Sequence, residues 1–132
     1  MDGILLAAAS HSTSCGKADE YINKSEDVGP NGFDPRKSAD AYAVAGNEYE
    51  TCSKAASSAE DKAKFLTLAV MANDQAMVRY LDAKETALGS GAAVTAMGDY
   101  AKLNKMPSLD ATTSQWRAAL KPLIVQDATL IR

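Results

Sequence analysis

The chain has 132 residues and a mass of 13.9 kDa, with 14 Lys and Arg side chains against 17 Asp and Glu. This length predicts a single domain over residues 1–132, and the near-balanced charge argues against nucleic acid as the main partner. No apolar run reaches the roughly 18 residues that a membrane-spanning helix needs. Alanine occupies 25 positions, whereas Ile and Val together occupy 10. Because alanine favours helices and β-branched residues favour sheets, the composition predicts an all-α protein.

The N-terminal segment is predicted to form a first helix from about Ile4 to Asn23. We expect an interruption near Ser12–Gly16, where Ser, Thr and Gly weaken a helix. The apolar start has no basic residue before it, unlike a secretory signal. This start is therefore either an ordinary first helix or the beginning of a mature exported chain to which a Met has been added. We favour the second interpretation because of the two cysteines discussed below. Whether residues 1–14 belong to the fold or form a loosely attached segment is left open.

The next two helices follow the clearest loop of the chain, Val28–Gly32. Asp34 is predicted to cap the second helix, and Pro35 suits its first position because no amide donor is needed there. Ser57 and Glu60 form a capping-box pattern, which predicts the start of a third helix ending near residue 72.

The middle of the third helix, residues 65–72, is apolar on most sides and is predicted to be the most deeply buried segment. We expect a joint at Asn73-Asp74 and a fourth helix that ends at Gly89-Ser90-Gly91. A fifth helix is predicted from about Ala92 to Asn104. After Met106-Pro107-Ser108 a sixth helix is expected, which Pro122 kinks or splits. Short joints predict five to seven helices packed as antiparallel hairpins.

The second helix resembles the first helix of a tetratricopeptide-type repeat. Tyr42, Ala45, Gly46 and Tyr49 match the spacing of bulky, small, glycine and aromatic positions in such repeats, best within residues 39–72. The resemblance implies helical hairpins in which a small residue lets the second helix approach closely. It also implies that the chain displays a surface to a protein or peptide.

The resemblance places three partner-binding residues on the concave side of the second helix: Asp40, Asn47 and Glu50. Family members that hold a terminal carboxylate have an Asn directly after the Gly and a Lys four residues earlier. Here Asn47 matches, but Ala43 stands at the Lys position. The two carboxylates would repel an acidic tail, so an extended or basic partner segment fits this surface better.

The two cysteines, Cys15 and Cys52, are 37 residues apart. Either they form a disulfide between the first and second helices, or they are buried free thiols of a cytoplasmic protein. We favour the disulfide, which would contribute roughly 3–4 kcal/mol and imply a periplasmic or secreted protein. A hairpin folded at residues 29–30 would place Cys15 opposite Val44, so the bond requires the first helix to break or to cross at an angle.

The sequence contains no constellation that predicts catalysis, a metal site or a cofactor. His11 is the single histidine and lies one turn before Cys15, and Asp99 and Asp110 stand as single carboxylates. Five aromatic side chains fall on predicted inward stripes: Tyr42, Tyr49, Tyr80, Tyr100 and Trp116. We therefore predict a non-catalytic protein–protein interaction module, exported, with a helical groove for a partner. The alternative is a helical bundle that binds a small apolar ligand among Ala, Met and Tyr. Whether the chain forms a homo-oligomer is left open.

Overall fold

The computed structural model describes residues 14–27, 29–106 and 111–130, and it confirms the all-α prediction over these ranges. Five helices are described: α2 (Gly16–Ser25), α3 (Pro35–Ala55), α4 (Ala59–Asp82), α5 (Thr86–Asn104) and α6 (Ala111–Leu130). The predicted helical segment before Thr13 and the predicted break at Met106-Pro107-Ser108 lie largely outside the described residues. In the described ranges no strand forms, and extended pairing is limited to an isolated bridge between Gly29 and Gly32.

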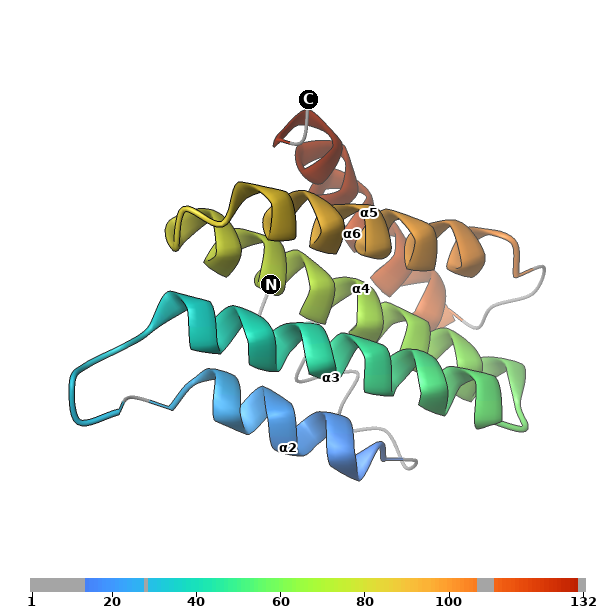
Figure 1. Ribbon diagram of the computed structural model, residues 1–132. Helices are drawn as coiled ribbons and strands as arrows, with labels where there is room; N and C mark the ends of the chain where they lie inside the picture. Colours follow the sequence, from blue (N-terminus) through green and yellow to red (C-terminus); the bar gives the residue numbers. More distant parts are fainter. Residues whose placement is uncertain (1–13, 28, 107–110, 131–132) are drawn as a thin grey trace.

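Consecutive helices lie side by side, as Figure 1 shows: α2 next to α3, α3 next to α4, and α4 next to α5. The α6 helix packs against both α4 and α5. The α4 helix is therefore the central element, because it contacts α3, α5 and α6. This arrangement confirms sequential packing of antiparallel neighbours.

The start of α3 is formed as the sequence predicts. The Asp34 carboxylate accepts hydrogen bonds from the backbone amides of Arg36 and Lys37, at 3.0 and 3.3 Å, and Pro35 is the first helical residue. The predicted cap of the next helix is wrong by one residue. Ser58, not Ser57, caps α4, and its hydroxyl accepts from the Asp61 amide at 3.1 Å.

The joint predicted at Asn73-Asp74 is wrong, because α4 continues through it to Asp82. Both side chains are buried and have partners inside the protein. The Asn73 amide group donates to the Ala69 carbonyl at 3.0 Å and to Asp99 at 3.4 Å. These contacts offset the usual preference of Asn and Asp for helix ends.

The true break between α4 and α5 is at residues 83–85, where Lys84 adopts a positive φ of 63°. Gly89-Ser90-Gly91, predicted to end a helix, lies inside α5. Gly89 is buried there, and a Cβ at this position would lie 3.0 Å from Leu81. Leu88 also belongs to α5, not to the helix before it, and is 40% exposed.

The core confirms the predicted burial of residues 65–72, all of which are buried in α4. The aromatic side chains Tyr42, Tyr49, Tyr80 and Trp116 are buried as predicted, and Tyr100 is half-buried. On α6, Leu120 is fully buried, and the helix is continuous through Pro122. Small side chains predominate in these contacts, so the helices pack at close range with little apolar area per residue.

Candidate interaction surface

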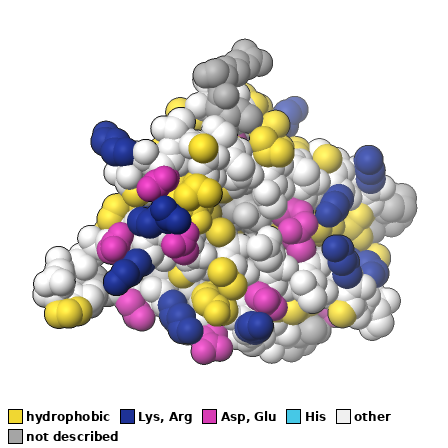
Figure 2. Space-filling model, in the orientation of Figure 1, with side chains coloured by type: hydrophobic (Ala, Val, Ile, Leu, Met, Phe, Trp, Pro, Cys, Tyr) yellow, Lys and Arg dark blue, Asp and Glu magenta, His cyan; other side chains and the backbone are white. Residues whose placement is uncertain are grey.

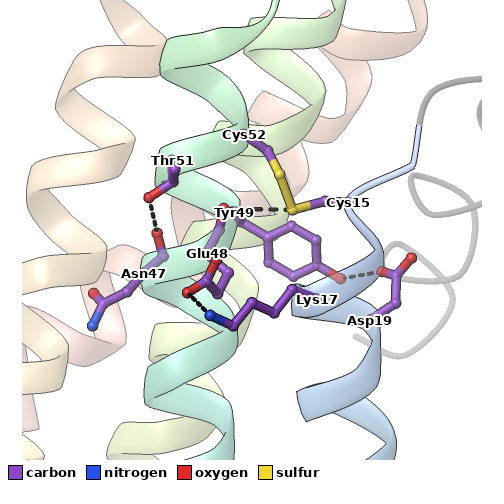
Figure 3. The surroundings of a disulfide bond; sticks show 8 residues. All are labelled: Cys15, Lys17, Asp19, Asn47, Glu48, Tyr49, Thr51 and Cys52. Carbon is purple, nitrogen blue, oxygen red and sulfur yellow. Dashed lines mark hydrogen bonds and ion pairs between the residues drawn. A yellow bond between two sulfur atoms is a disulfide. The ribbon is translucent and has the colours of Figure 1, made fainter.

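A disulfide joins Cys15, directly before α2, to Cys52 near the end of α3 (Figure 3). The Cα atoms are 6.2 Å apart. This confirms the predicted pairing. Residues 14 and 15 are not helical and α2 begins at Gly16, while the helical segment predicted before them lies outside the described residues. The Cys15 Sγ lies 3.4 Å from the Glu48 carbonyl oxygen. A disulfide sulfur carries no proton, so this is a packing contact and not a hydrogen bond.

Two tyrosine hydroxyls hold α2 and its following turn against α3. Tyr49 donates a hydrogen bond to Asp19 at 2.8 Å, and Tyr42 donates one to Glu26. Burial and the bond to Asp19 raise the pKa of the Tyr49 hydroxyl, which therefore remains a donor. The residues of these pairs and of the disulfide lie at nearly equal distances along the sequence on either side of Asp34, so the chain reverses direction near Asp34. The reversal assumed at residues 29–30 is wrong because the connection after α2 is long.

The first predicted partner-binding residue, Asp40, is held in place and yet half exposed. Its Oδ1 accepts from the Tyr80 hydroxyl at 2.6 Å and from Arg36 Nε at 3.2 Å. Arg36 Nη1 also lies 3.1 Å from the carboxylate of Glu85, the residue directly before α5. Burial, and then the bond to Asp40, raise the pKa of Tyr80 to about 12. The Asp40 carboxylate is therefore a fixed acceptor with a free side toward solvent.

The second predicted residue, Asn47, is exposed on α3, and its side chain points away from the disulfide (Figure 3). The third, Glu50, is directed to α5, where Lys102 Nζ lies 3.3 Å from its carboxylate. Asp99 of α5 also hydrogen-bonds to Glu50. The structure therefore leaves Asp40 and Asn47 open to a partner, while Glu50 is engaged by the neighbouring helix.

The contact between Asp99 and Glu50 was not predicted, because the sequence shows these carboxylates on separate helices. Asp99 is 1% exposed, and burial together with the bond to Glu50 raises its pKa to about 8. Hydrogen bonding from Asp99 lowers the pKa of Glu50. At neutral pH Asp99 therefore carries the proton and donates it to an ionised Glu50.

A second carboxyl pair, Asp74 of α4 and Asp127 of α6, was also missed. Both side chains are buried, at 2% and 0% exposure, and the two carboxyl groups interact with each other. Among the described residues, Asp74 Oδ2 and both Asp127 carboxyl oxygens have no other hydrogen-bond partner, so a proton held between the two carboxyl groups is what satisfies them. Burial and the neighbouring carboxyl raise the pKa of Asp127 to about 8, and burial raises that of Asp74. Two carboxylates in contact cannot both ionise at low cost, so the pair shares a proton at neutral pH. The sequence signal that could have indicated this pair is Asp74 itself, because an Asp within a buried helix needs a polar partner from another part of the chain.

Two hollows lie near the ends of α3. The first, of about 830 Å³, lies between α2, the 29–34 turn and the first half of α3. Tyr21, Phe33 and Asp40 contribute to its lining. The second, of about 240 Å³, lies where α3 ends and α4 begins, and Glu50 contributes to its lining. Asp40 and Glu50, predicted together, therefore border different hollows.

Other sequence candidates add nothing to this surface. His11 and Asp110 lie outside the described residues. Within the described ranges, no group of three His, Cys, Asp or Glu side chains is arranged to hold a metal ion. Over the same part of the chain, no helix has the length and apolar character needed to cross a membrane.

Compared with protein-family models, with curated proteins and with solved structures, the chain gives no match.

Proposed function

We propose that the chain is a non-catalytic protein-binding module whose partner sits on the α2–α3 surface, in the first hollow and beside Asp40. The observation that carries the proposal is the hollow itself. Its volume of about 830 Å³ is in the range of ligand sites, but it is formed by an exposed turn and two helix faces and opens to solvent. Such a site fits a polypeptide segment better than an enclosed small molecule.

The aromatic side chains of the hollow supply anchoring groups. Phe33 is 43% exposed, although the Arg79 guanidinium lies 5.0 Å from its ring centroid. Tyr21 lines the same hollow from α2. Exposed aromatic side chains next to a hollow are typical of the residues that dominate binding energy in protein interfaces.

The charge of the hollow supports a basic or extended partner segment. Its lining contains the acidic residues Asp27, Asp34 and Asp40 against the basic residues Lys24 and Lys37. A basic side chain of the partner can approach the open side of Asp40 without displacing Tyr80 or Arg36. Asn47, one turn beyond the hollow, offers an amide for the backbone of the same segment.

The surface is preorganised, which lowers the entropic cost of binding. The disulfide and the bonds from Tyr42 and Tyr49 hold α2 against α3, so both walls of the hollow keep their positions. The same disulfide supports an exported protein, periplasmic or secreted, because such bonds persist in oxidising compartments.

The proposed likeness to tetratricopeptide repeats rests on the close packing of α3 and α4. A Cβ on Gly46 would lie 2.5 Å from the Asn73 side chain, so only glycine fits this approach. The helices, at 21 and 24 residues, are longer than those of a repeat of about 34 residues. We therefore propose a related hairpin geometry without the repeat length.

The alternative, a bundle that holds a small apolar ligand, has less support. The Met and Tyr side chains proposed to surround such a ligand fill the protein's own core. Met71, Met77 and Tyr49 are each 1% exposed and pack in the hydrophobic clusters.

Cross-linking and pull-down from the native host test the proposal. The wild-type chain should recover one stoichiometric protein, and Phe33→Ala and Asp40→Asn should reduce that recovery. Val125→Ala, which removes an exposed apolar side chain on α6, is the matched control and should leave it unchanged. Equal recovery by all variants would overturn the assignment of the surface. A stoichiometric lipid or chromophore in the purified protein would favour the alternative.

A further inference from the structure

The second hollow lies at the opposite end of α3 from the proposed protein-binding surface and has a different chemistry. Its charged lining consists of Lys54, Lys62 and Lys102 against Glu50, a net charge of +2 from three lysines and one glutamate. The whole chain, in contrast, has a net charge of −3. Figure 2 shows Lys and Arg side chains at both ends of the molecule: at this end, where α3 ends, α4 begins and α5 ends, few Asp or Glu side chains lie among them, whereas at the opposite end acidic and basic side chains are mixed.

Two of the three lysines are held by the fold. Lys62 Nζ lies 3.3 Å from the Ser53 carbonyl oxygen and 3.4 Å from that of Lys54, so it caps the C-terminal end of α3. Lys102 Nζ pairs with Glu50 at 3.3 Å. Among the described residues, the Lys54 ammonium group makes no hydrogen bond or ion pair within these distances. It is the cation available to a ligand.

The neighbouring carboxyl does not cancel this charge. Asp99 lies behind Glu50 and keeps its proton at neutral pH, because burial raises its pKa to about 8. The ionised Glu50 is already paired with Lys102. The excess of positive charge is therefore carried by Lys54 and Lys62.

The floor of the hollow is apolar. Leu66 and Met106 line it, and both belong to the cluster that packs α4 against α5 and α6. The volume of about 240 Å³ is below the range of about 300–1,000 Å³ typical of sites for drug-sized ligands. It has room for a compact apolar group of about the size of a leucine side chain, with an anion at the lysine rim.

We propose that this hollow binds a carboxylate attached to a compact apolar group, with the anion between Lys54 and Lys62 and the apolar group on Leu66 and Met106. The net charge of +2 would also accommodate a phosphate dianion, but the apolar floor of Leu66 and Met106 favours an anion that carries a compact apolar group. The carboxylate belongs either to a free small acid or to the C-terminus of a polypeptide. This site is independent of the proposed partner surface at the other end of α3.

Titration of the intact, oxidised chain with N-acetyl-leucine, followed by NMR, tests the site. We expect saturable binding with a dissociation constant of about 1 mM, the scale for a ligand of so few atoms. N-acetyl-leucinamide, which lacks the anion, should not saturate. Binding should weaken at high salt because the lysine rim is exposed. Equal binding of acid and amide, or tighter binding of inorganic phosphate, would overturn the proposal.

Matched lysine variants locate the ligand. Lys54→Gln should weaken binding about three- to fivefold, the scale of a half-exposed ion pair. Lys37→Gln removes the same charge from the other end of α3 and should have no effect. An effect of Lys37→Gln with none of Lys54→Gln would place the ligand in the first hollow and contradict the proposal.

A pair of short peptides separates the two sources. If a peptide ending in free leucine binds at least tenfold more tightly than N-acetyl-leucine, and its amidated form does not, the ligand is a polypeptide C-terminus. If peptide and small acid bind alike, a free acid is the natural ligand. Both results support the site. Tight binding of the amidated peptide would contradict it.

Discussion

The outer helices α2 and α6 are attached to the rest of the protein by different chemistry. We call α2 with its contacts to α3 the first flank, and α6 with its contacts to α4 the second flank. On one side, α2 is fixed to α3 by a covalent bond and by tyrosine hydroxyls that keep their protons far above neutral pH. On the other side, α6 meets α4 through Asp74 and Asp127, a buried carboxyl pair that needs a shared proton. The first flank is therefore insensitive to pH over the physiological range, whereas the second is not. The proposed partner surface lies on the first flank.

The largest expected effect comes from breaking the first flank. Replacing Cys15 and Cys52 with Ser should lower the free energy of unfolding by about 4 kcal/mol, because the disulfide closes a loop of 37 residues in the unfolded chain. Urea denaturation at pH 5 and at pH 8 should show the same loss at both values. A variant as stable as the wild-type protein would contradict the role of the disulfide.

A smaller effect is expected where α3 approaches α4. Gly46→Ala should cost about 2–3 kcal/mol, because the added Cβ meets the buried Asn73 side chain and disturbs its bonds to Ala69 and Asp99. Gly98→Ala is the matched control in α5. No atom lies within 4 Å of a Cβ there, and alanine favours the helix by up to about 1 kcal/mol. Thermal melts that move in the same direction for both variants would refute this packing argument.

The pH dependence of the second flank is expected to be smaller still. The pKa of Asp127 is raised in the folded state, so its stabilising contribution is complete in acid and is lost as pH rises toward about 8. We expect the free energy of unfolding to fall by on the order of 2 kcal/mol between pH 5 and pH 8.5, after allowance for screening. Asp99 contributes in the same direction.

Asp127→Asn separates the two pairs. The amide can donate a hydrogen bond to an ionised Asp74, so this variant should lose most of the pH dependence that arises at α6 and keep that of Asp99. A variant whose denaturation profile against pH matches the wild-type profile would show that the Asp74–Asp127 pair does not control stability.

Sequence patterns predicted the features that local chemistry decides. Asp34 specifies the start of α3 by capping it, and Pro35 does so because the first helical position needs no amide donor. The alanine content specifies helices along the whole chain. The Cys15–Cys52 disulfide was favoured over free thiols because closing a loop of that size would stabilise a domain with small core residues, and export was inferred from the disulfide. The register of α2 was not predicted, since the length of the connection before Asp34 is not fixed by any local rule.

The errors lie where a distant residue satisfies a polar or flexible group. Asn73 and Asp74 are typical of helix ends, but Asp99 and Asp127 supply the partners that keep them inside α4. Gly89 is typical of a helix stop, but the Leu81 side chain fills the space beside it. For the same reason neither carboxyl pair could be recognised from spacing along one helix.

Hydrogen exchange resolved by helix, at pH 6 and pH 8.5, tests the contrast between the two flanks most directly. After correction for the intrinsic exchange rate, amides of α6 should lose opening free energy at the higher pH, while those of α2 should keep theirs. Equal losses in both helices, or a loss confined to α2, would contradict the assignment of covalent attachment to α2 and proton-dependent attachment to α6.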